Sequence, residues 1–265
     1  MITGLELPLL TLVLLVLASF FAGWVDAVVG GGGLIQLPAL LIGLPSDTPV
    51  ATIAGTNKVP SFLGTLTASA TYLRTIRVDW TLAWPLLVLA AAGSWSGAQL
   101  THFLPRQHFT PLVLFAVVSV GWYTWRRPHL GLHSTLKHAG NDARLRMALI
   151  GLVVGLWDGF IGPGTGTFFV IALVSVIGYD FLASSALAKV ANLTTNASAI
   201  VAFTITGNIL WGLGLVMGLA NLTGGYLGAR TALSRGNGFV RTVFLLVVGA
   251  LAIKLAWDTF WTYWP

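Results

Sequence analysis

The sequence contains no cysteine and few charged residues. Without cysteine, the 265-residue chain can form neither a disulfide framework nor a thiolate metal site. Only 8% of its residues are charged, against about 25% in an ordinary soluble domain, and 56% are hydrophobic. Such a chain cannot cover a water-facing surface with polar side chains. The composition therefore predicts an all-α polytopic membrane protein that has the lipid bilayer as its surroundings.

Histidine is missing from the apolar stretches, which limits the chemistry available inside a membrane. All five histidines fall in connections between apolar segments, at His102, His108, His129, His133 and His138. A hydrolase needs its base or its metal ligands buried beside the nucleophile. The glycine-rich runs also lack the Lys-Ser/Thr pair of a phosphate-binding loop. We therefore predict that the protein is not an enzyme and has no catalytic residue, metal site or cofactor.

Acidic residues are also few, eight against fourteen Lys and Arg, which leaves a net charge of +6. Most basic residues lie in connections between apolar segments, where they are typical of charges that set membrane topology. This placement argues against a nucleic-acid partner. Residues 8–28 are as apolar as a signal peptide, but Glu6 precedes them and no Lys or Arg does. We interpret them as the first transmembrane segment.

Ten apolar segments are separated by short connections, with one longer exception. The segments fall at about 8–29, 33–44, 49–73, 80–101, 109–125, 146–161, 166–178, 182–206, 209–230 and 239–261. The only long hydrophilic connection, 126–145, divides the chain almost in half. This pattern predicts a first membrane repeat at 1–125, a connecting loop at 126–145 and a second membrane repeat at 146–265.

The two halves align with each other at a shift of about 131 residues. Gly23-Trp24-Val25-Asp26 matches Gly155-Leu156-Trp157-Asp158, and Lys58-Val59 matches Lys189-Val190. The pairs Gly93/Gly97 and Gly224/Gly228 also match, and their spacing is typical of close helix packing. Chance similarity between two apolar sequences would match Leu and Val rather than Asp, Lys and Gly. We infer an internal duplication.

A glycine-rich break interrupts the first apolar stretch of each half, at 30–33 and at 162–166. A helix does not continue cheaply through such a run, because Gly costs about 1 kcal/mol and Pro about 3 kcal/mol. The segments that follow, 34–44 and 167–178, are too short to cross a bilayer upright, so we predict broken or re-entrant helices. The same runs would also allow close helix packing, which is the simpler interpretation.

The number of segments decides the relative orientation of the halves. With five segments in each half, an odd number, the halves have opposite orientations, as in many secondary transporters. Residues 74–79, 126–145 and 231–238 then share one side, and their basic residues indicate the cytoplasm. If each short segment only completes a broken span, the halves are parallel. Loop charge favours inverted repeats.

Four ionisable residues stand out inside the apolar segments: Asp26, Lys58, Asp158 and Lys189. Each costs at least about 2.5–3.5 kcal/mol at the centre of a bilayer, so such residues indicate function. Each lysine lies about nine residues into its segment, roughly 13 Å along a helix and close to the midplane. Alternatively, Asp26 with Lys58 and Asp158 with Lys189 form structural ion pairs.

These charges and the helix starts after the glycine breaks together predict an anion site. Helix N-termini carry partial positive charge and unpaired N–H groups, which bind anions. The predicted substrate-binding residues are Lys58, Lys189, Asn57, Asn192, Gly31, Gly32, Gly33, Gln36, Gly164, Thr165, Thr167, Ser61 and Asn196. Asp26 and Asp158 are predicted to form ion pairs or to couple a proton.

The motifs resemble one known family over nearly the whole chain. The run from Asp26 through Gly30-Gly31-Gly32-Gly33 to Ile35, followed by Gly55-Thr56-Asn57-Lys58, is similar to the first half of the TauE/SafE sulfite exporter family. This family is also called the toluene-sulfonate uptake permeases. Asp158 through Gly166, with Ala188-Lys189-Val190, resembles its second half, and the YfcA-like branch is the most similar. The resemblance implies about eight spanning helices in a bacterial inner membrane.

The resemblance and the residues both favour a permease for a small anion, and the resemblance implies sulfite, a sulfonate or a related sulfur anion. We therefore predict a secondary transporter that works by alternating access, driven by a proton or ion gradient or by the substrate's own gradient. An anion channel with the same site, an intramembrane enzyme and a purely structural subunit are the alternatives. The sequence leaves open whether the chain forms a homo-oligomer.

Overall fold

The computed structural model describes residues 7–45, 47–101, 122, 126 and 131–263, and the secondary-structure elements of these residues are all helices. They are α1 (Leu9–Val29), α2 (Gly33–Gly43), α3 (Val50–Leu73), α4 (Trp80–Leu100), α6 (Gly140–Phe160), α7 (Thr165–Ala172), the π-helical turn η2 (Leu173–Ile177), α8 (Phe181–Ile205) and α9 (Trp211–Tyr263). The prediction of an all-helical chain is confirmed for this part. Apart from Trp122, the expected segment 109–125 lies outside the described residues.

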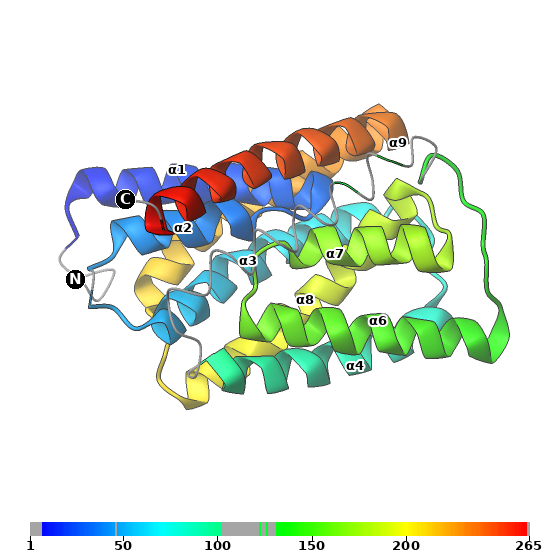
Figure 1. The fold of residues 1–265 in the computed structure, drawn as a ribbon, viewed down its shortest axis with the longest axis horizontal. Coiled ribbons are helices and arrows are strands. Elements are labelled where there is room, and N and C mark those ends of the chain that lie inside the picture. The colour runs from blue at the N-terminus through cyan, green and yellow to red at the C-terminus, as the bar shows by residue number, and fades with distance from the viewer. Residues whose placement is uncertain (1–6, 46, 102–121, 123–125, 127–130, 264–265) are drawn as a thin grey trace.

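The helices lie side by side along the longest axis of the molecule (Figure 1). At one end, on the right of Figure 1, lie the turn between α3 and α4, the segment that leads into α6 and the kink of α9. We call this the basic end, because Arg74, Arg77, Lys137 and Arg235 lie there. The start of α1, the connection from α8 to α9 and the last turns of α9 lie at the opposite end.

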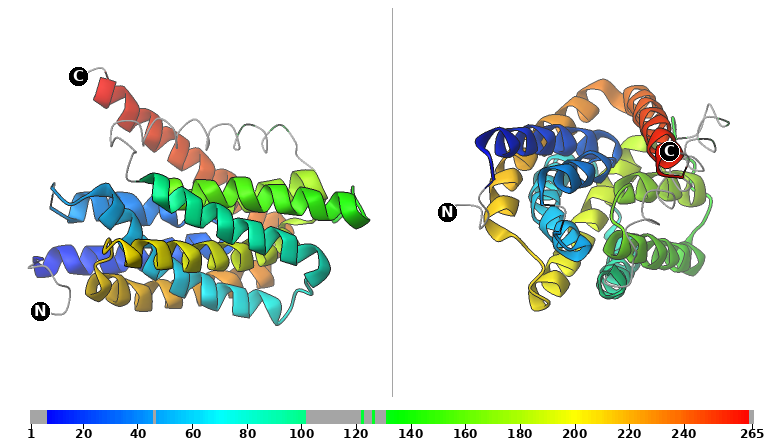
Figure 2. Two further views of the ribbon diagram at one scale, coloured as in Figure 1. Left: turned by 90° about the horizontal axis from the view of Figure 1, so that it is seen from below. Right: turned by 60° about the vertical axis from the view of Figure 1, so that its left-hand side comes forward.

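Two expected boundaries of the second half differ from the structure. α6 begins at Gly140, six residues before the expected 146, because a polar first turn extends the helix beyond the apolar stretch. In this turn Asp142 accepts a hydrogen bond from Arg146 Nε, 3.0 Å from Oδ2. The expected connection 231–238 is a sharp kink within α9, where Gly236 adopts φ 78°. The last part of α9 then turns back toward the N-terminal end of α1 and diverges from the other helices (Figure 2).

The surface suits a lipid environment. α1 and α4 are each 21 residues long and have mean hydropathies of 2.3 and 1.2, which suffices for a membrane span. α3 and α8 are longer, at 24 and 25 residues. They differ from α1 and α4 because each buries several polar side chains, including Lys58 in α3 and Lys189 in α8. Large apolar side chains point outward, and Ile42 and Ile253 are 85% and 74% exposed. A water-soluble protein rarely exposes so much apolar surface.

Glycines bring the helices of the two halves into close contact. A Cβ atom at Gly93 or Gly97 of α4 would lie within 3.0 Å of the α6 backbone. A Cβ atom at Gly224 or Gly228 of α9 would meet the α1 backbone in the same way. The packing role predicted for these glycines is confirmed. α4 thus packs on α6, the first helix of the second half, α9 packs on α1, the first helix of the first half, and α3 contacts α8.

Candidate functional site

The site begins where α1 and α6 end, near the middle of the molecule. Gly30 and Gly162 adopt φ values of 83° and 90°, a left-handed conformation that favours glycine and stops each helix. The next helices, α2 and α7, start within four residues of these glycines. The two breaks touch each other, because Thr167 N donates to Gly30 O at 3.1 Å and Thr167 Oγ1 donates to Val29 O at 3.2 Å.

Lys58 of α3 contacts the last turn of α6. Its Nζ lies 2.8 Å from Asp158 Oδ2 and also donates to the main-chain oxygen of Asp158 at 2.8 Å. The side chains of Lys58 and Asp158 are only 4% and 3% exposed. The ammonium group therefore neutralises both a carboxylate and the partly negative C-terminal end of a helix.

Lys189 of α8 makes the equivalent contact with the last turn of α1. Its Nζ lies 3.0 Å from Asp26 Oδ2 and also donates to the main-chain oxygen of Asp26. The Lys189 side chain is fully buried, whereas Asp26 is 17% exposed. The pairing considered from the sequence, Asp26 with Lys58 and Asp158 with Lys189, is wrong. Each lysine pairs with the aspartate of the other half, because α1 and α6 end beside the opposite central helix.

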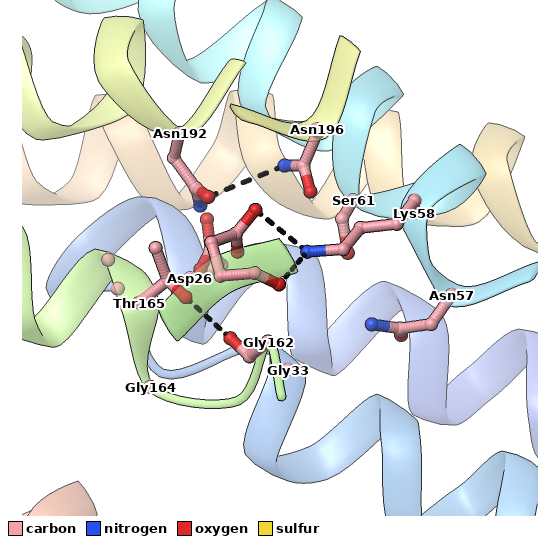
Figure 3. A pocket seen from close by; sticks show the side chains of 13 residues that line it. Asp26, Gly33, Asn57, Lys58, Ser61, Gly162, Gly164, Thr165, Asn192 and Asn196 are labelled. Atoms are coloured by element: carbon pink, nitrogen blue, oxygen red, sulfur yellow. Dashed lines mark hydrogen bonds and ion pairs between the residues drawn. The ribbon is translucent and has the colours of Figure 1, made fainter. Parts of the chain in front are cut away.

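A small polar cavity of about 20 Å³ adjoins the Lys58–Asp158 pair, with room for about one water molecule (Figure 3). Its lining residues come from α3, α8, the last turns of α1 and α6, and both glycine breaks. They are Asp26, Gly30, Gly33, Asn57, Lys58, Ser61, Asp158, Gly162, Gly164, Thr165, Gly166, Asn192 and Asn196. The structure therefore brings together eight of the predicted substrate-binding residues and both aspartates. Gly30, Gly162 and Gly166 were missed, although they belong to the same glycine runs.

Five predicted site residues do not line this cavity: Lys189, Gly31, Gly32, Gln36 and Thr167. Gln36 instead belongs to a buried network, since its Nε2 donates to Ser19 Oγ at 3.0 Å and its Oε1 accepts from Asn221 Nδ2 at 3.1 Å. Thr167 holds α7 against α1, as described above. Gly32 N donates to Asp26 Oδ1 at 3.3 Å, so this amide orients the carboxylate.

Uncharged polar groups complete the cavity lining. Asn196 Nδ2 donates to Asn192 Oδ1 at 3.5 Å, and Thr165 Oγ1 donates to Gly162 O at 2.7 Å (Figure 3). Asn57 Oδ1 is buried and has no hydrogen-bond partner among the described residues. These amide and hydroxyl groups can exchange their weak internal hydrogen bonds for bonds to a polar ligand.

The charges at the centre balance in this conformation. Lys58 and Lys189 carry two positive charges and Asp158 and Asp26 two negative charges, each within an ion pair. The strongly positive centre expected from the sequence is therefore absent while both pairs are closed. Within the part of the chain that the structure describes, no group of three His, Asp or Glu residues could hold a metal ion. The site can attract an anion only if a lysine is released from its aspartate.

The chain is similar in sequence to known membrane proteins over almost its whole length. The chain is 33% identical to "Probable membrane transporter protein ORF9" of a Sinorhizobium species, over 93% of each chain. It is 33% identical to a "Probable membrane transporter protein" of Haemophilus influenzae, over 94% of this chain and 96% of that protein. It is 31% identical to "Probable membrane transporter protein YfcA" of Escherichia coli, over 95% and 91%. No solved structure matches the chain.

The relatives are described as membrane transporters and not as enzymes, in agreement with the prediction from the sequence. Membrane localisation and transport are thus supported by proteins that match almost the whole chain. The profile of the sulfite exporter TauE/SafE family covers residues 15–255, including both glycine breaks and both lysine–aspartate pairs. This chain belongs to the sulfite exporter TauE/SafE family.

Proposed function

We propose that the chain is a secondary transporter of a small anion that works by alternating access. A sulfur oxyanion, such as sulfite or a sulfonate, is the favoured substrate because of the family to which the chain belongs. The observation that carries the proposal is the buried Lys58–Asp158 pair beside a small polar cavity. Buried ionisable groups are rare inside membrane proteins, and they mark substrate and ion pathways.

The anion binds where Lys58 becomes available. When the ammonium group leaves Asp158, it offers three N–H donors and a full positive charge to the oxygens of the substrate. Thr165 and Asn192 add neutral donors from the second half of the chain. The start of α7, just after Gly164, adds the partial positive charge of a helix N-terminus. Together these groups replace the hydration shell of a small oxyanion.

A proton on Asp158 is the simplest way to release Lys58. Protonation removes the negative charge that holds the ammonium group, so the centre gains one positive charge for the anion to neutralise. Anion and proton then move together, and the empty carrier returns with the ion pair closed. Asp26 also lines the cavity, but its partner Lys189 is fully buried and does not. We therefore assign proton coupling to Asp158 and a structural role to the Lys189–Asp26 pair.

Alternating access fits two inverted repeats. α1 runs from the opposite end toward the basic end, whereas α6 runs the other way (Figure 1). The matched glycines of α4 and α9, and the crossed lysine–aspartate pairs, support a two-fold relation between residues 1–125 and 146–265. Movement of one half against the other would open the central cavity first to one end and then to the other.

The conformation described here would be an occluded one. The central cavity holds about one water molecule, so it must widen before an oxyanion can enter. Basic residues in connections generally remain in the cytoplasm. We therefore assign the basic end to the cytoplasmic face of a bacterial inner membrane, with several helices spanning the bilayer.

Flux into proteoliposomes tests the proposal. Uptake of sulfite, sulfate, thiosulfate, methanesulfonate and acetate would be compared for the wild type, Lys58→Ala and Lys137→Ala. Lys137 is a matched control, because it donates to Ser175 O at the basic end, away from the cavity. We expect saturable uptake of a sulfur oxyanion with counterflow, lost in Lys58→Ala alone. Unchanged flux in a folded Lys58→Ala protein, or a preference for cations, would contradict the proposal; large conductance without counterflow would indicate a channel.

A further inference from the structure

An open pocket of about 390 Å³ lies at the basic end, between the C-terminal end of α3 and the part of α9 that precedes its kink. It shares no lining residue with the central cavity. None of its lining residues is acidic, so the pocket combines positive charge with hydroxyl groups. Its polar lining residues are two arginines, one tyrosine and three smaller residues with hydroxyl groups: Arg74, Arg230, Tyr226, Thr71, Thr75 and Ser234.

The pocket lies just beyond a close contact between α3 and α9. Thr67 Oγ1 of α3 donates a hydrogen bond to Leu222 O of α9 at 2.9 Å. Thr71 and Tyr226 each lie one helical turn further along, toward the basic end, and both line the pocket. The contact one turn away fixes the distance between the two helices. The walls of the pocket are therefore in place before a ligand binds.

The positive charge in this pocket has no acidic partner. Neither Arg74 nor Arg230 forms an ion pair with a carboxylate of the described residues. Arg230 Nη1 donates to Tyr226 Oη at 3.1 Å, and the Arg230 guanidinium lies 5.6 Å from the centre of the Tyr226 ring. These contacts position the side chain but leave its charge uncompensated. Because a guanidinium group can bind phosphate through two parallel hydrogen bonds, the pair of arginines suits a phosphate group.

The depth of the pocket corresponds to the lipid headgroups. Arg74 lies sixteen residues beyond Lys58, about 24 Å along α3, whereas half of the hydrocarbon core is about 15 Å thick. Nearer the middle of the bilayer, the same helices expose apolar side chains, with Leu66 of α3 at 42% and Leu219 of α9 at 67%. Leu219 precedes Tyr226 by seven residues and so lies on the same face of α9. Acyl chains of a lipid held in the pocket would therefore lie on apolar surface.

The two arginines are not a product of the internal duplication. The shift of about 131 residues between the halves relates Arg74 to Ile205 and Arg230 to Gln99. Ile205 and Gln99 are exposed at the opposite end of the molecule, and neither is charged. The charged pocket thus belongs to the basic end alone, which we assign to the cytoplasmic face. Anionic lipids give the cytoplasmic leaflet its negative surface potential.

We propose that the pocket between α3 and α9 binds the phosphate group of an anionic phospholipid from the cytoplasmic leaflet. Arg74 and Arg230 bind the phosphate oxygens, and the Tyr226 hydroxyl, which accepts from Arg230, donates its own hydrogen to one of them. A zwitterionic phospholipid carries a cation beside its phosphate and gains less from two uncompensated arginines. The inference goes beyond the proposed transport function and does not depend on it.

Thermal unfolding of the delipidated protein in a non-ionic detergent tests the site. The additions are phosphatidylglycerol, phosphatidylcholine and inorganic phosphate. The pocket variant is Arg74→Gln/Arg230→Gln, and the matched control is Arg77→Gln/Arg235→Gln, which removes two exposed arginines of the same end that do not line the pocket. In the wild type and the control, we expect phosphatidylglycerol to raise the unfolding temperature at about tenfold lower concentration than phosphatidylcholine. The pocket variant should respond equally to both lipids.

Native mass spectrometry measures the bound lipid directly and without transport. Phosphatidylglycerol should remain bound to the wild type and the control but not to the pocket variant. Equal responses of the wild type to the two lipids, or unchanged phosphatidylglycerol binding in a folded pocket variant, would overturn the proposal. If inorganic phosphate stabilises the wild type as well as phosphatidylglycerol does and displaces it, the pocket binds a free anion and the lipid proposal fails.

Discussion

Lys58 Nζ lies 2.8 Å from both the carboxylate Oδ2 and the main-chain oxygen of Asp158, and so joins the middle of α3 to the last turn of α6. The contact links residues one hundred positions apart in the chain. It also joins the first half of the chain to the second. In the proposed mechanism, the Lys58 ammonium group must leave Asp158 before it can bind an anion.

Removal of Lys58 alone should destabilise the protein more than removal of the whole ion pair. Lys58→Met leaves the buried Asp158 carboxylate uncompensated, which costs about 3–5 kcal/mol. The double variant Lys58→Met/Asp158→Leu removes both charges and should recover most of this loss in thermal unfolding in detergent. Neither variant should transport anions. Normal flux in the double variant would show that the pair serves stability only.

Asp158→Asn should separate anion binding from proton coupling. The amide cannot carry a negative charge, so Lys58 is permanently available to the anion. Anion exchange in counterflow should therefore continue, whereas uptake driven by a pH gradient should be lost.

Asp26→Asn is the matched control for this prediction, because Asp26 pairs with Lys189 rather than with Lys58. It should retain gradient-driven uptake if it folds. The proposed role of Asp158 fails if Asp158→Asn still accumulates anions in response to a pH gradient.

Close packing of α4 on α6 should make Gly97 intolerant of a methyl group. The Cβ atom of Gly97→Ala would meet Leu156 O and Phe160 N, both of the α6 backbone. A loss of about 1–3 kcal/mol is expected from overpacking. In Gly238→Ala nothing lies within 4 Å of the new Cβ, so stability should be unchanged or slightly higher. Equal unfolding temperatures for the two variants would argue against the close helix contact.

The start of α4 should depend on the Asp79 carboxylate. Asp79 Oδ1 accepts from Thr81 N at 2.9 Å and from Thr81 Oγ1 at 2.7 Å, and these hydrogen bonds hold the pKa of Asp79 below its ordinary value. Asp79→Ala should cost about 0.5–1 kcal/mol, at the lower end for a lost N-cap because the carboxylate is exposed.

The contribution of the Asp79 cap to folding stability depends on pH, because the pKa of Asp79 is lower in the folded protein. Because the folded pKa is depressed, the stabilisation is complete above the ordinary carboxyl pKa and is lost as pH falls through the lower folded value. Asp79→Asn keeps a capping oxygen and should lose only the pH dependence. Thermal unfolding measured at several acidic pH values checks both variants, and identical curves for wild type and Asp79→Asn would contradict the prediction.

The glycine runs and the buried charges could be recognised from the sequence because each violates the chemistry of an apolar helix. Gly30 and Gly162 do end α1 and α6, and Lys58 and Asp158 do lie at the central cavity. Gln36 and Thr167 are also polar residues in apolar segments, but they form hydrogen bonds between helices and do not line the cavity. A polar side chain in an apolar segment indicates that it needs a partner, but not whether the partner is protein or substrate.

The sequence by itself determined the helical membrane class, the places where helices break and the four residues whose burial requires compensation, because each depends on local composition and on the cost of burying charge. Only the tertiary structure decided that Lys58 pairs with Asp158 and Lys189 with Asp26. Pairing depends on which helix ends approach each central helix, and glycine contacts between the halves fix that approach. Tertiary packing also decided which of the predicted polar residues line the cavity.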